Sequence, residues 1–279
     1  MQCCRLLVIE DDSSFESSFK KNLLERNYHI VSVSSREEAL KHISLSSYST
    51  VLWQIASIQE RELYFLREIK SLDEHIPVIV LSDTIDRKIL ISLISMKIFA
   101  CLNKEPDITE LMEMIKAALE TFSDGEEIKI ASAKIDFMEF IIPARTNYIP
   151  RLSNYMGYFL FMFTHRDTQR LLYAFRELLQ NAMEHGSSYC PSKKIIIRYL
   201  QTQKFLFFSI EDEGTGFNLS CLPHAAIGER KNSAMEVMQY RKQNGMRPGG
   251  LGIASAFSIA DEILYNEKGN AVVMIKYFG

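Results

Sequence analysis

The chain has 279 residues, 47% of them hydrophobic and 24% charged, which is typical of a globular protein with two ordinary domains. Its 32 basic and 35 acidic residues give a formal net charge of -3 without a Lys/Arg-rich block, which argues against nucleic-acid binding. No apolar run approaches the roughly 20 residues that a membrane span needs, and the N-terminus lacks the pattern of a signal peptide. The five cysteines lack CxxC or Cys/His metal spacing. We therefore expect a cytoplasmic protein without a membrane span, a disulfide framework or a zinc site.

From residue 5 to about 120, short β-rich apolar runs alternate with segments of helical period. The runs are RLLVI, HIVSVS, TVLWQ, PVIVLS and FACLN. Five such β-α units predict a doubly wound α/β domain, with a parallel sheet and helices on both faces. The stretch TFSDGEE, residues 121–127, interrupts the last helical pattern. It predicts a first domain over 1–122, a linker over 123–127 and a second domain over 128–279.

Chemistry-bearing residues follow several of these predicted strands. In VIEDD, Glu10 and Asp11 come just after the first strand, where two converging carboxylates would repel unless a cation or a lysine joined them. A plain alternative is that these acids, and Asp12 in particular, cap the next helix. Ser82 ends the fourth apolar run, and Lys104 follows the fifth.

These positions together resemble a response-regulator receiver domain over about 115 residues. The resemblance implies that Glu10 and Asp11 are magnesium-holding acids, that Ser82 is the switch hydroxyl and that Lys104 is the site lysine. Gln54, in TVLWQIAS, then stands where such domains carry the phosphate-accepting aspartate. A carboxamide is a poor nucleophile and cannot form the acyl phosphate.

A second departure from the receiver pattern lies at Cys101, where such domains carry an aromatic residue. With both the acceptor and this aromatic missing, we predict a pseudo-receiver that is used for docking or dimerisation and binds Mg2+ weakly. The loss of one carboxylate leaves Lys104 available to pair with Glu10 or Asp11.

The second half mixes helices and strands in blocks. A strand-like run, IKIASAKIDFMEFII, precedes helical segments near 146–163 and 167–185, and the strands KIIIRYL and KFLFFSIED follow. After a polar segment over 218–248 come a glycine-opened helix and two final strand-like runs, DEILYN and AVVMIKYF. This order predicts an α+β two-layer sandwich with an antiparallel or mixed sheet.

Three short stretches of this half carry chemistry. FRELLQNAMEHG places Glu177, Asn181 and Glu184 on one side of a helix that looks substantially buried. EDEGTGF delivers Asp212 at the end of a strand, followed by glycines that allow close approach of a ligand. RPGGLGIASA opens a helix with glycines, which frees amide donors for phosphate.

In this order and spacing the three stretches resemble the GHKL-type ATPase domain, and its anti-sigma-factor serine kinase branch in particular. The resemblance implies ATP and Mg2+ as cofactors, with Glu177 as general base, Asn181 as magnesium ligand and Asp212 as the adenine-reading carboxylate. It also implies a mobile lid over 218–248 and two glycine boxes that contact the nucleotide, formed by Gly214 and Gly216 and by Gly250, Leu251 and Gly252.

The resemblance implies a signalling switch that transfers the γ-phosphate of ATP to a serine or threonine of a partner, such as an anti-sigma antagonist, or binds a sigma factor. A homodimer is compatible with it. Two alternatives stay open: a nucleotide-gated module that sequesters a partner without phosphotransfer, and a plain ATPase. Histidine autophosphorylation is disfavoured, because neither His165 nor His224 stands in an acceptor-type helical hairpin and His185 suits a structural role.

Overall fold

The computed structural model describes residues 4–10, 17–124, 128–160, 165–216 and 259–278. The chain divides into two compact units, one of Met1–Glu127 with Pro150–Tyr158 and the other of Ile128–Ile149 with Phe159–Gly279. Among the described residues, none of the helices is long and apolar enough to cross a membrane.

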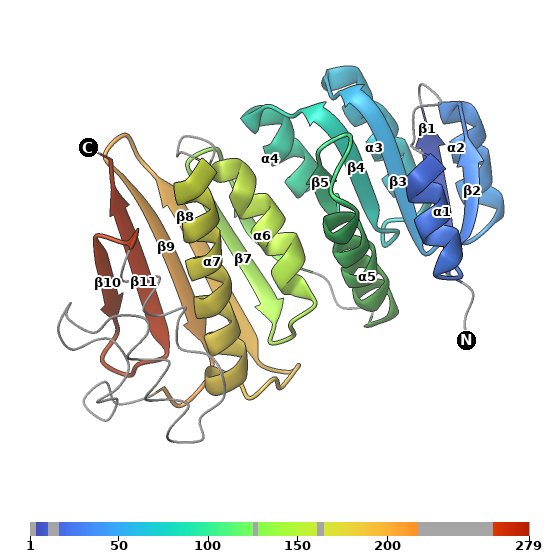
Figure 1. Cartoon of the computed structure of the whole chain (residues 1–279). Helices are drawn as coiled ribbons and strands as arrows, with labels where there is room; N and C mark the ends of the chain where they lie inside the picture. The colour runs from blue at the N-terminus through green and yellow to red at the C-terminus, as the bar shows by residue number, and fades with distance from the viewer. Residues whose placement is uncertain (1–3, 11–16, 125–127, 161–164, 217–258, 279) are drawn as a thin grey trace. The chain divides into compact units, whose positions relative to one another are not determined.

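The first unit holds a five-stranded parallel sheet with strand order β2-β1-β3-β4-β5 (Figure 1). Its elements in chain order are β1 (Arg5–Glu10), α1 (Ser17–Glu25), β2 (His29–Val33), α2 (Arg36–Leu45), β3 (Thr50–Ser57), α3 (Glu60–Leu72), β4 (Val78–Thr84), α4 (Arg87–Ser95), β5 (Ala100–Leu102) and α5 (Ile108–Asp124). The doubly wound α/β fold predicted from the alternating runs is confirmed.

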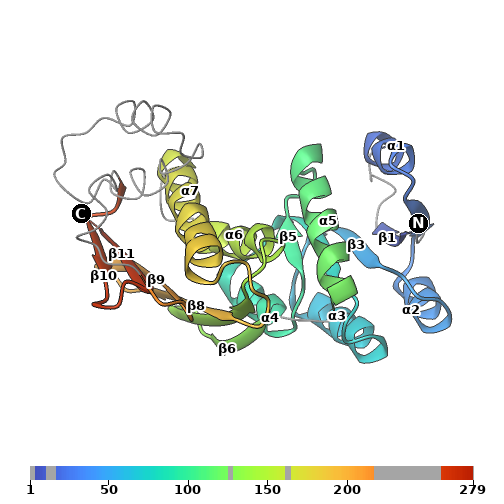
Figure 2. The same ribbon diagram turned by 90° about the horizontal axis from the view of Figure 1, so that it is seen from below.

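Helices cover both faces of this sheet, as Figure 2 shows. On one face, Phe19 and Leu23 of α1 and Leu111 and Ile115 of α5 form a buried cluster with residues of the central strands. Helices α2, α3 and α4 lie on the other face. The central strands are therefore buried on both sides, which explains why they are continuous apolar runs. Helix α5 ends at Asp124, inside the stretch 121–127 that was predicted to interrupt it, and the Thr121 hydroxyl donates to the Ala117 carbonyl (2.8 Å) in its last turns.

The open edge of β5 is bonded to the segment Pro150–Tyr158, which belongs to the same unit. The Asn154 side chain donates to the Cys101 carbonyl (2.7 Å) and accepts from the Cys101 amide (3.0 Å), as a neighbouring strand would. Tyr155 donates to the Ile98 carbonyl, and the Arg151 guanidinium lies 4.8 Å from the centre of the Phe99 ring. An edge strand presents unpaired backbone groups, and here a side-chain amide satisfies one pair of them.

The second unit holds a six-stranded antiparallel sheet with strand order β10-β11-β9-β8-β7-β6. The remaining elements of the chain are β6 (Lys129–Ala133), β7 (Phe137–Pro143), α6 (Tyr148–Phe159), α7 (His165–Asn181), the π-helical turn η1 (Ala182–Gly186), β8 (Lys194–Gln201), β9 (Phe205–Asp212), β10 (Glu262–Tyr265) and β11 (Ala271–Tyr277). Helix α7 lies on one face of the sheet (Figure 2). The predicted α+β fold with an antiparallel sheet is confirmed.

One element of this half differs from the expectation. The run IKIASAKIDFMEFII is a hairpin of two antiparallel strands, β6 and β7, and not a single strand. The turn is closed by bonds between the backbones of Lys134 and Phe137 and contains neither glycine nor proline, which is why the sequence did not reveal it.

The core of the second unit is built on aromatic rings. The Phe175 ring of α7 lies 5.6 Å from the Phe208 ring of β9, measured between centroids, and Phe208 lies 5.6 Å from Tyr199 of β8. Tyr199 in turn contacts Phe159 at 5.0 Å. These contacts fix α7 against β8 and β9, the strands that lead to the second candidate site.

Candidate functional site

The carboxyl edge of the parallel sheet brings Glu10 and Gln54 together. They are direct neighbours in the parallel pairing of β1 with β3 and are buried to 6% and 1% exposure. Gln54 Nε2 donates to the backbone carbonyl of Lys104 (3.3 Å), whereas Gln54 Oε1 has no hydrogen-bond partner among the described residues. Ser82 Oγ donates to the carbonyl oxygens of Ala56 (3.3 Å) and Thr84 (3.4 Å).

The cation beside Glu10 is Lys20, whose Nζ lies 2.5 Å from Glu10 Oε1. The sequence pointed to Lys104 as a partner of Glu10 or Asp11 and did not reveal Lys20, and the pairing of Lys104 stays a prediction. Helix α1 packs on the sheet through Phe19 and Leu23, and this presents Lys20 at the end of β1. A contact between a strand end and the following helix depends on packing, so no sequence pattern indicates it directly.

The remaining receiver-type positions are only partly described. Asp11 and Asp12 lie outside the described residues, so neither their predicted magnesium role nor the capping alternative can be placed. Cys101, at the position of the missing aromatic, is fully buried in β5, and this burial raises the pKa of its thiol to about 12. Within the described ranges, no group of three or more His, Cys, Asp or Glu side chains is arranged to hold a metal ion.

The second candidate site starts from α7. Leu178 and Leu179 are buried, as the sequence predicts, which leaves Glu177 and Asn181 half-buried, four residues apart on one flank of the helix. The hydroxyl of Tyr173, one turn before Glu177, bonds to its carboxylate, and burial followed by this carboxylate raises the pKa of Tyr173. The two residues that the family resemblance assigns to catalysis and magnesium are thus neighbours.

Glu184 does not continue this row. Helix α7 ends at Asn181 and the chain widens into the π-helical turn η1, in which the Ser187 amide bonds to the Ala182 carbonyl (2.9 Å). The wider turn breaks the register that the sequence predicted for Glu184, and its carboxylate accepts from the Tyr189 hydroxyl (2.9 Å) instead.

Asp212 lies at the end of β9 on the buried face of the sheet. Side chains alternate along a strand, so Asp212 shares a face with Leu206, Phe208 and Ile210, which are all buried. Asp212 itself is 8% exposed. Its Oδ1 accepts from the Gly214 amide (2.7 Å), the one hydrogen bond that the described residues make to this carboxylate. Burial raises the pKa of Asp212, and the Gly214 amide partly opposes this rise.

Two of the three sequence motifs meet at this carboxylate. A Cβ added to Gly186, at the end of η1, would overlap the Asp212 carboxyl group, and one added to Gly214 would overlap the Gly186 carbonyl. Gly216 has a φ of +74°, a conformation that favours glycine. Gly186 was not among the predicted site residues, although NAMEHG contains it. A side chain is excluded at position 186 only because η1 contacts β9, and this contact cannot be read from the sequence.

The third motif cannot be placed. Gly250, Leu251 and Gly252 lie outside the described residues, and so does the predicted lid over 218–248. His224 also falls there, whereas His185 is exposed at the end of η1.

Comparison with protein families assigns both halves. Residues 6–116 match the response regulator receiver domain, and residues 142–276 match the histidine kinase-like ATPase domain. The chain joins a receiver domain to a histidine kinase-like ATPase domain. This combination is that of a signalling protein, and the ATPase-like half is of a type that suggests nucleotide binding.

Solved structures similar to the chain include receiver domains from three organisms. A CheY-like receiver domain protein from Methanospirillum hungatei JF-1 is 18% identical, with a TM-score of 0.41, and the match covers 44% of this chain and 99% of that one. One from Clostridium thermocellum is 24% identical, with a TM-score of 0.40 and the same coverage. The response regulator TrrA from Thermotoga maritima is 25% identical over 42% of this chain and 99% of its own, with a TM-score of 0.36. A comparison with curated proteins finds no match.

Proposed function

We propose that the second unit binds Mg-ATP and transfers its γ-phosphate to a serine or threonine of a regulatory protein, in the manner of an anti-sigma-factor kinase. The first unit is a receiver-like domain that does not accept phosphate and regulates this switch. The partner is an anti-sigma antagonist or a sigma factor, and the chain forms a homodimer through one of its units.

The observation that carries the proposal is the meeting of η1 with β9. Asp212 is a buried carboxylate whose Oδ1 accepts a hydrogen bond from the Gly214 amide. Among the described residues, no donor bonds to its Oδ2, so this oxygen can accept from a ligand. Because Gly186 lacks a Cβ, one side of the carboxyl group is backbone only. A carboxylate in this setting suits the 6-amino group of adenine, a donor at the position where guanine has a carbonyl oxygen.

The residues of α7 fit the phosphate end of the same ligand. Asn181 offers a neutral oxygen to Mg2+, a hard ion that keeps several waters and is shared with phosphate oxygens. Glu177 has a carboxylate one turn away, which can accept the proton of a serine or threonine hydroxyl. Bound Mg-ATP would supply the transferable phosphoryl group, and the glycines at 250 and 252 are proposed to contact its phosphates.

The first unit supports a regulatory role without phosphorylation. Its acceptor position holds Gln54, whose nitrogen already donates to the Lys104 carbonyl. The carboxylate beside it is neutralised by Lys20 rather than left for a metal. Both features favour one fixed arrangement of the site over a phosphate-driven change.

The test is phosphate transfer from γ-labelled ATP by the full chain in a lysate of its source. Glu177→Gln and Asn181→Ala are compared with Glu184→Gln, a matched control that removes a charge from η1 at a side chain bonded to Tyr189. We expect a labelled serine or threonine on another protein, lost in the first two variants and retained in the control.

Tight Mg-ATP binding without transfer would contradict the kinase and support the alternative of a nucleotide-gated binding module. In that case Glu177→Gln would retain an ATP-dependent partner. Label released only as free phosphate would support the plain ATPase, and absence of nucleotide binding would overturn the proposal as a whole.

A further inference from the structure

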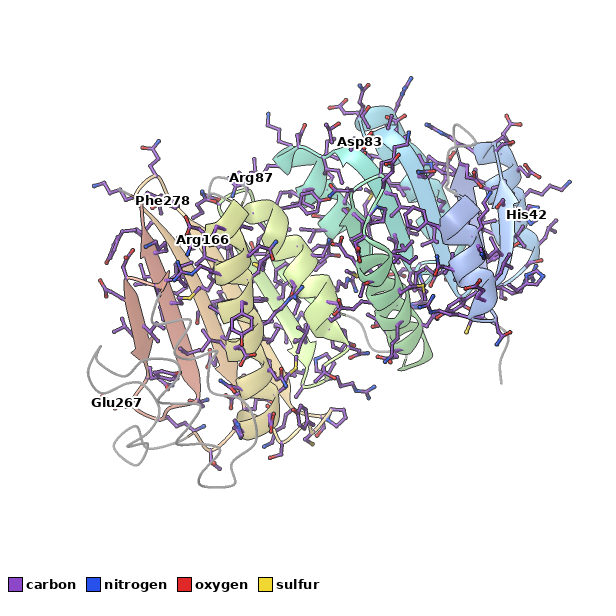
Figure 3. The ribbon with its side chains drawn as sticks, viewed as in Figure 1. His42, Asp83, Arg87, Arg166, Glu267 and Phe278 are labelled. Carbon is purple, nitrogen blue, oxygen red and sulfur yellow. The ribbon has the colours of Figure 1, made fainter. Side chains whose placement is uncertain are left out.

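The turn between β10 and β11, Asn266–Asn270, is closed by one of its own side chains. Asn266 Oδ1 accepts from the backbone amides of Asn270 (3.0 Å) and Ala271 (3.1 Å), and the Gly269 amide bonds to the Asn266 carbonyl (3.0 Å). Figure 3 labels Glu267, which marks this turn at the end of the hairpin. A side chain that bonds to the backbone in this way fixes a turn that would otherwise sample several conformations.

This turn lies beside Asp212, because β11 pairs with β9 and Ala271 stands opposite Glu211. The Asp212 amide donates to the Asn270 carbonyl (2.9 Å), and Asn270 Nδ2 donates to the Asp212 carbonyl (2.5 Å). Asn270 is 9% exposed. One buried residue thus holds both backbone groups of the candidate adenine-reading residue.

Asn266 also fixes the orientation of Asn270. Asn266 Nδ2 donates to Asn270 Oδ1 (2.9 Å), which leaves the amide nitrogen of Asn270 to face the Asp212 carbonyl. The series of bonds therefore runs from Asn266, an exposed residue, through Asn270 to the backbone of Asp212.

The same turn contacts the other end of the DxGxG segment. A Cβ added to Gly216 would overlap the Lys268 carbonyl and lie 3.2 Å from the Asn270 amide nitrogen. The segment from Asp212 to Gly216 is thus held by the turn at both ends, while Gly214 in its middle bonds to the Asp212 carboxylate.

From these contacts we propose that Asn266 and Asn270 are positioning residues for base recognition: they hold the backbone of Asp212 so that its carboxylate is aimed at the exocyclic amine of adenine. The inference rests on the proposed function, since it requires that the second unit binds ATP. A hydrogen bond weakens steeply when its angle departs from linearity, so a strand end that shifts would lose this bond while the rest of the pocket is retained.

The test compares two nucleotides in the full chain. One is ATP, and the other is purine riboside triphosphate, which has the same sugar and phosphates but lacks the exocyclic amine. In wild type we expect ATP to bind about tenfold more tightly, the difference that a hydrogen bond to a charged acceptor supports. Asn270→Ala and Asn266→Ala should lower the ATP affinity to that of the analogue and leave the analogue's affinity unchanged.

Two further variants separate positioning from general loss of structure. Asn266→Asp keeps the acceptor for the Asn270 and Ala271 amides but cannot donate to Asn270 Oδ1, and it should lose part of the preference for ATP. Thr202→Ala is the matched control: Thr202 Oγ1 closes the β8–β9 turn at the opposite end of β9 by accepting from the amides of Lys204 and Phe205 (3.1 Å each). It should leave the preference at the wild-type value.

The possible outcomes separate the positioning role of the two asparagines from nucleotide binding itself. An equal loss of affinity for both nucleotides, or a preference for ATP that survives Asn270→Ala, would overturn the positioning role while nucleotide binding stands. If wild-type protein binds neither nucleotide, the proposed function itself fails, and the positioning role fails with it.

Discussion

At the residue scale, the buried carboxylate of Asp212 lowers the stability of the fold and, in the proposed function, binds the adenine of ATP. Burial raises the pKa of its carboxyl group above the usual 3.8, against the opposing effects of the Gly214 amide, Lys268 and Lys193. At pH values between 3.8, the usual pKa of an aspartate, and the raised pKa of the folded state, the folded protein binds more protons than the unfolded protein. The stability of the protein therefore falls as pH rises through this window, because ionising the buried group is unfavourable.

We therefore predict that Asp212→Asn is not less stable than wild type at neutral pH, although it binds ATP at least about tenfold more weakly. The amide oxygen still accepts from Gly214 but carries no charge to bury. Chemical unfolding across the acidic range should show that the pH-dependent step of wild type is smaller in the variant. A variant that is clearly destabilised at neutral pH would show that the ionised carboxylate is a net stabiliser.

The second prediction at this scale concerns Gln54. Gln54→Asp places a carboxylate directly beside Glu10, and two adjacent carboxylates repel unless a cation joins them. Mg2+ at several times its Kd should then stabilise the nucleotide-free variant by about 1 kcal/mol. Neither wild type nor Gln54→Asn, which matches aspartate in size without its charge, should respond. Thermal unfolding with and without Mg2+ measures the difference, and equal stabilisation of all three proteins would contradict the account.

At the element scale, the sequence predicted what depends on local periodicity. Continuous apolar runs with intervening helices predicted the parallel sheet, and the apolar run FLFFSI placed Asp212 at the end of a strand. What it could not predict depends on contacts between elements distant in the sequence. The π-helical register of η1 and the support of Asp212 by Asn270, 58 residues later, both arise from packing on β9.

Gly186 provides the prediction at this scale. In Gly186→Ala the new methyl group would overlap the Asp212 carboxyl group, so η1 must move away from β9, and both stability and ATP affinity should fall. If this contact is the cause, Asp212→Ala should remove the clash. Gly186→Ala should then cost less stability in the Asp212→Ala background than in wild type. A double-mutant cycle of unfolding free energies measures this coupling, and strict additivity would contradict it.

At the scale of the whole molecule, the first unit includes Pro150–Tyr158, which lies beyond the predicted linker and inside the segment that matches the ATPase domain. Arg151 and Tyr155 are buried to 4% and 1% exposure, and both bond to backbone carbonyls near β5. A fragment that lacks residues 1–122 would lose these partners. If this fragment were inactive, the cause could be the lost packing or the lost regulation, and the deletion would not distinguish the two. Communication between the halves therefore has to be tested by point variants in the intact chain.

Asn154 is the point at which to make such a variant. Its side chain holds the amide and the carbonyl of Cys101 on the open edge of β5. We predict that Asn154→Ala lowers the stability of the first unit by about 1 to 2 kcal/mol, as expected for two hydrogen bonds. Hydrogen exchange of the Cys101 amide should become faster, because its acceptor is gone. Asn154→Asp keeps an acceptor for this amide and should preserve its protection while losing the bond to the carbonyl. If the Cys101 amide in Asn154→Ala exchanges at the wild-type rate, the Asn154 side chain does not protect the sheet edge in solution, and the segment 150–158 is held there by Arg151 and Tyr155 alone among these three residues.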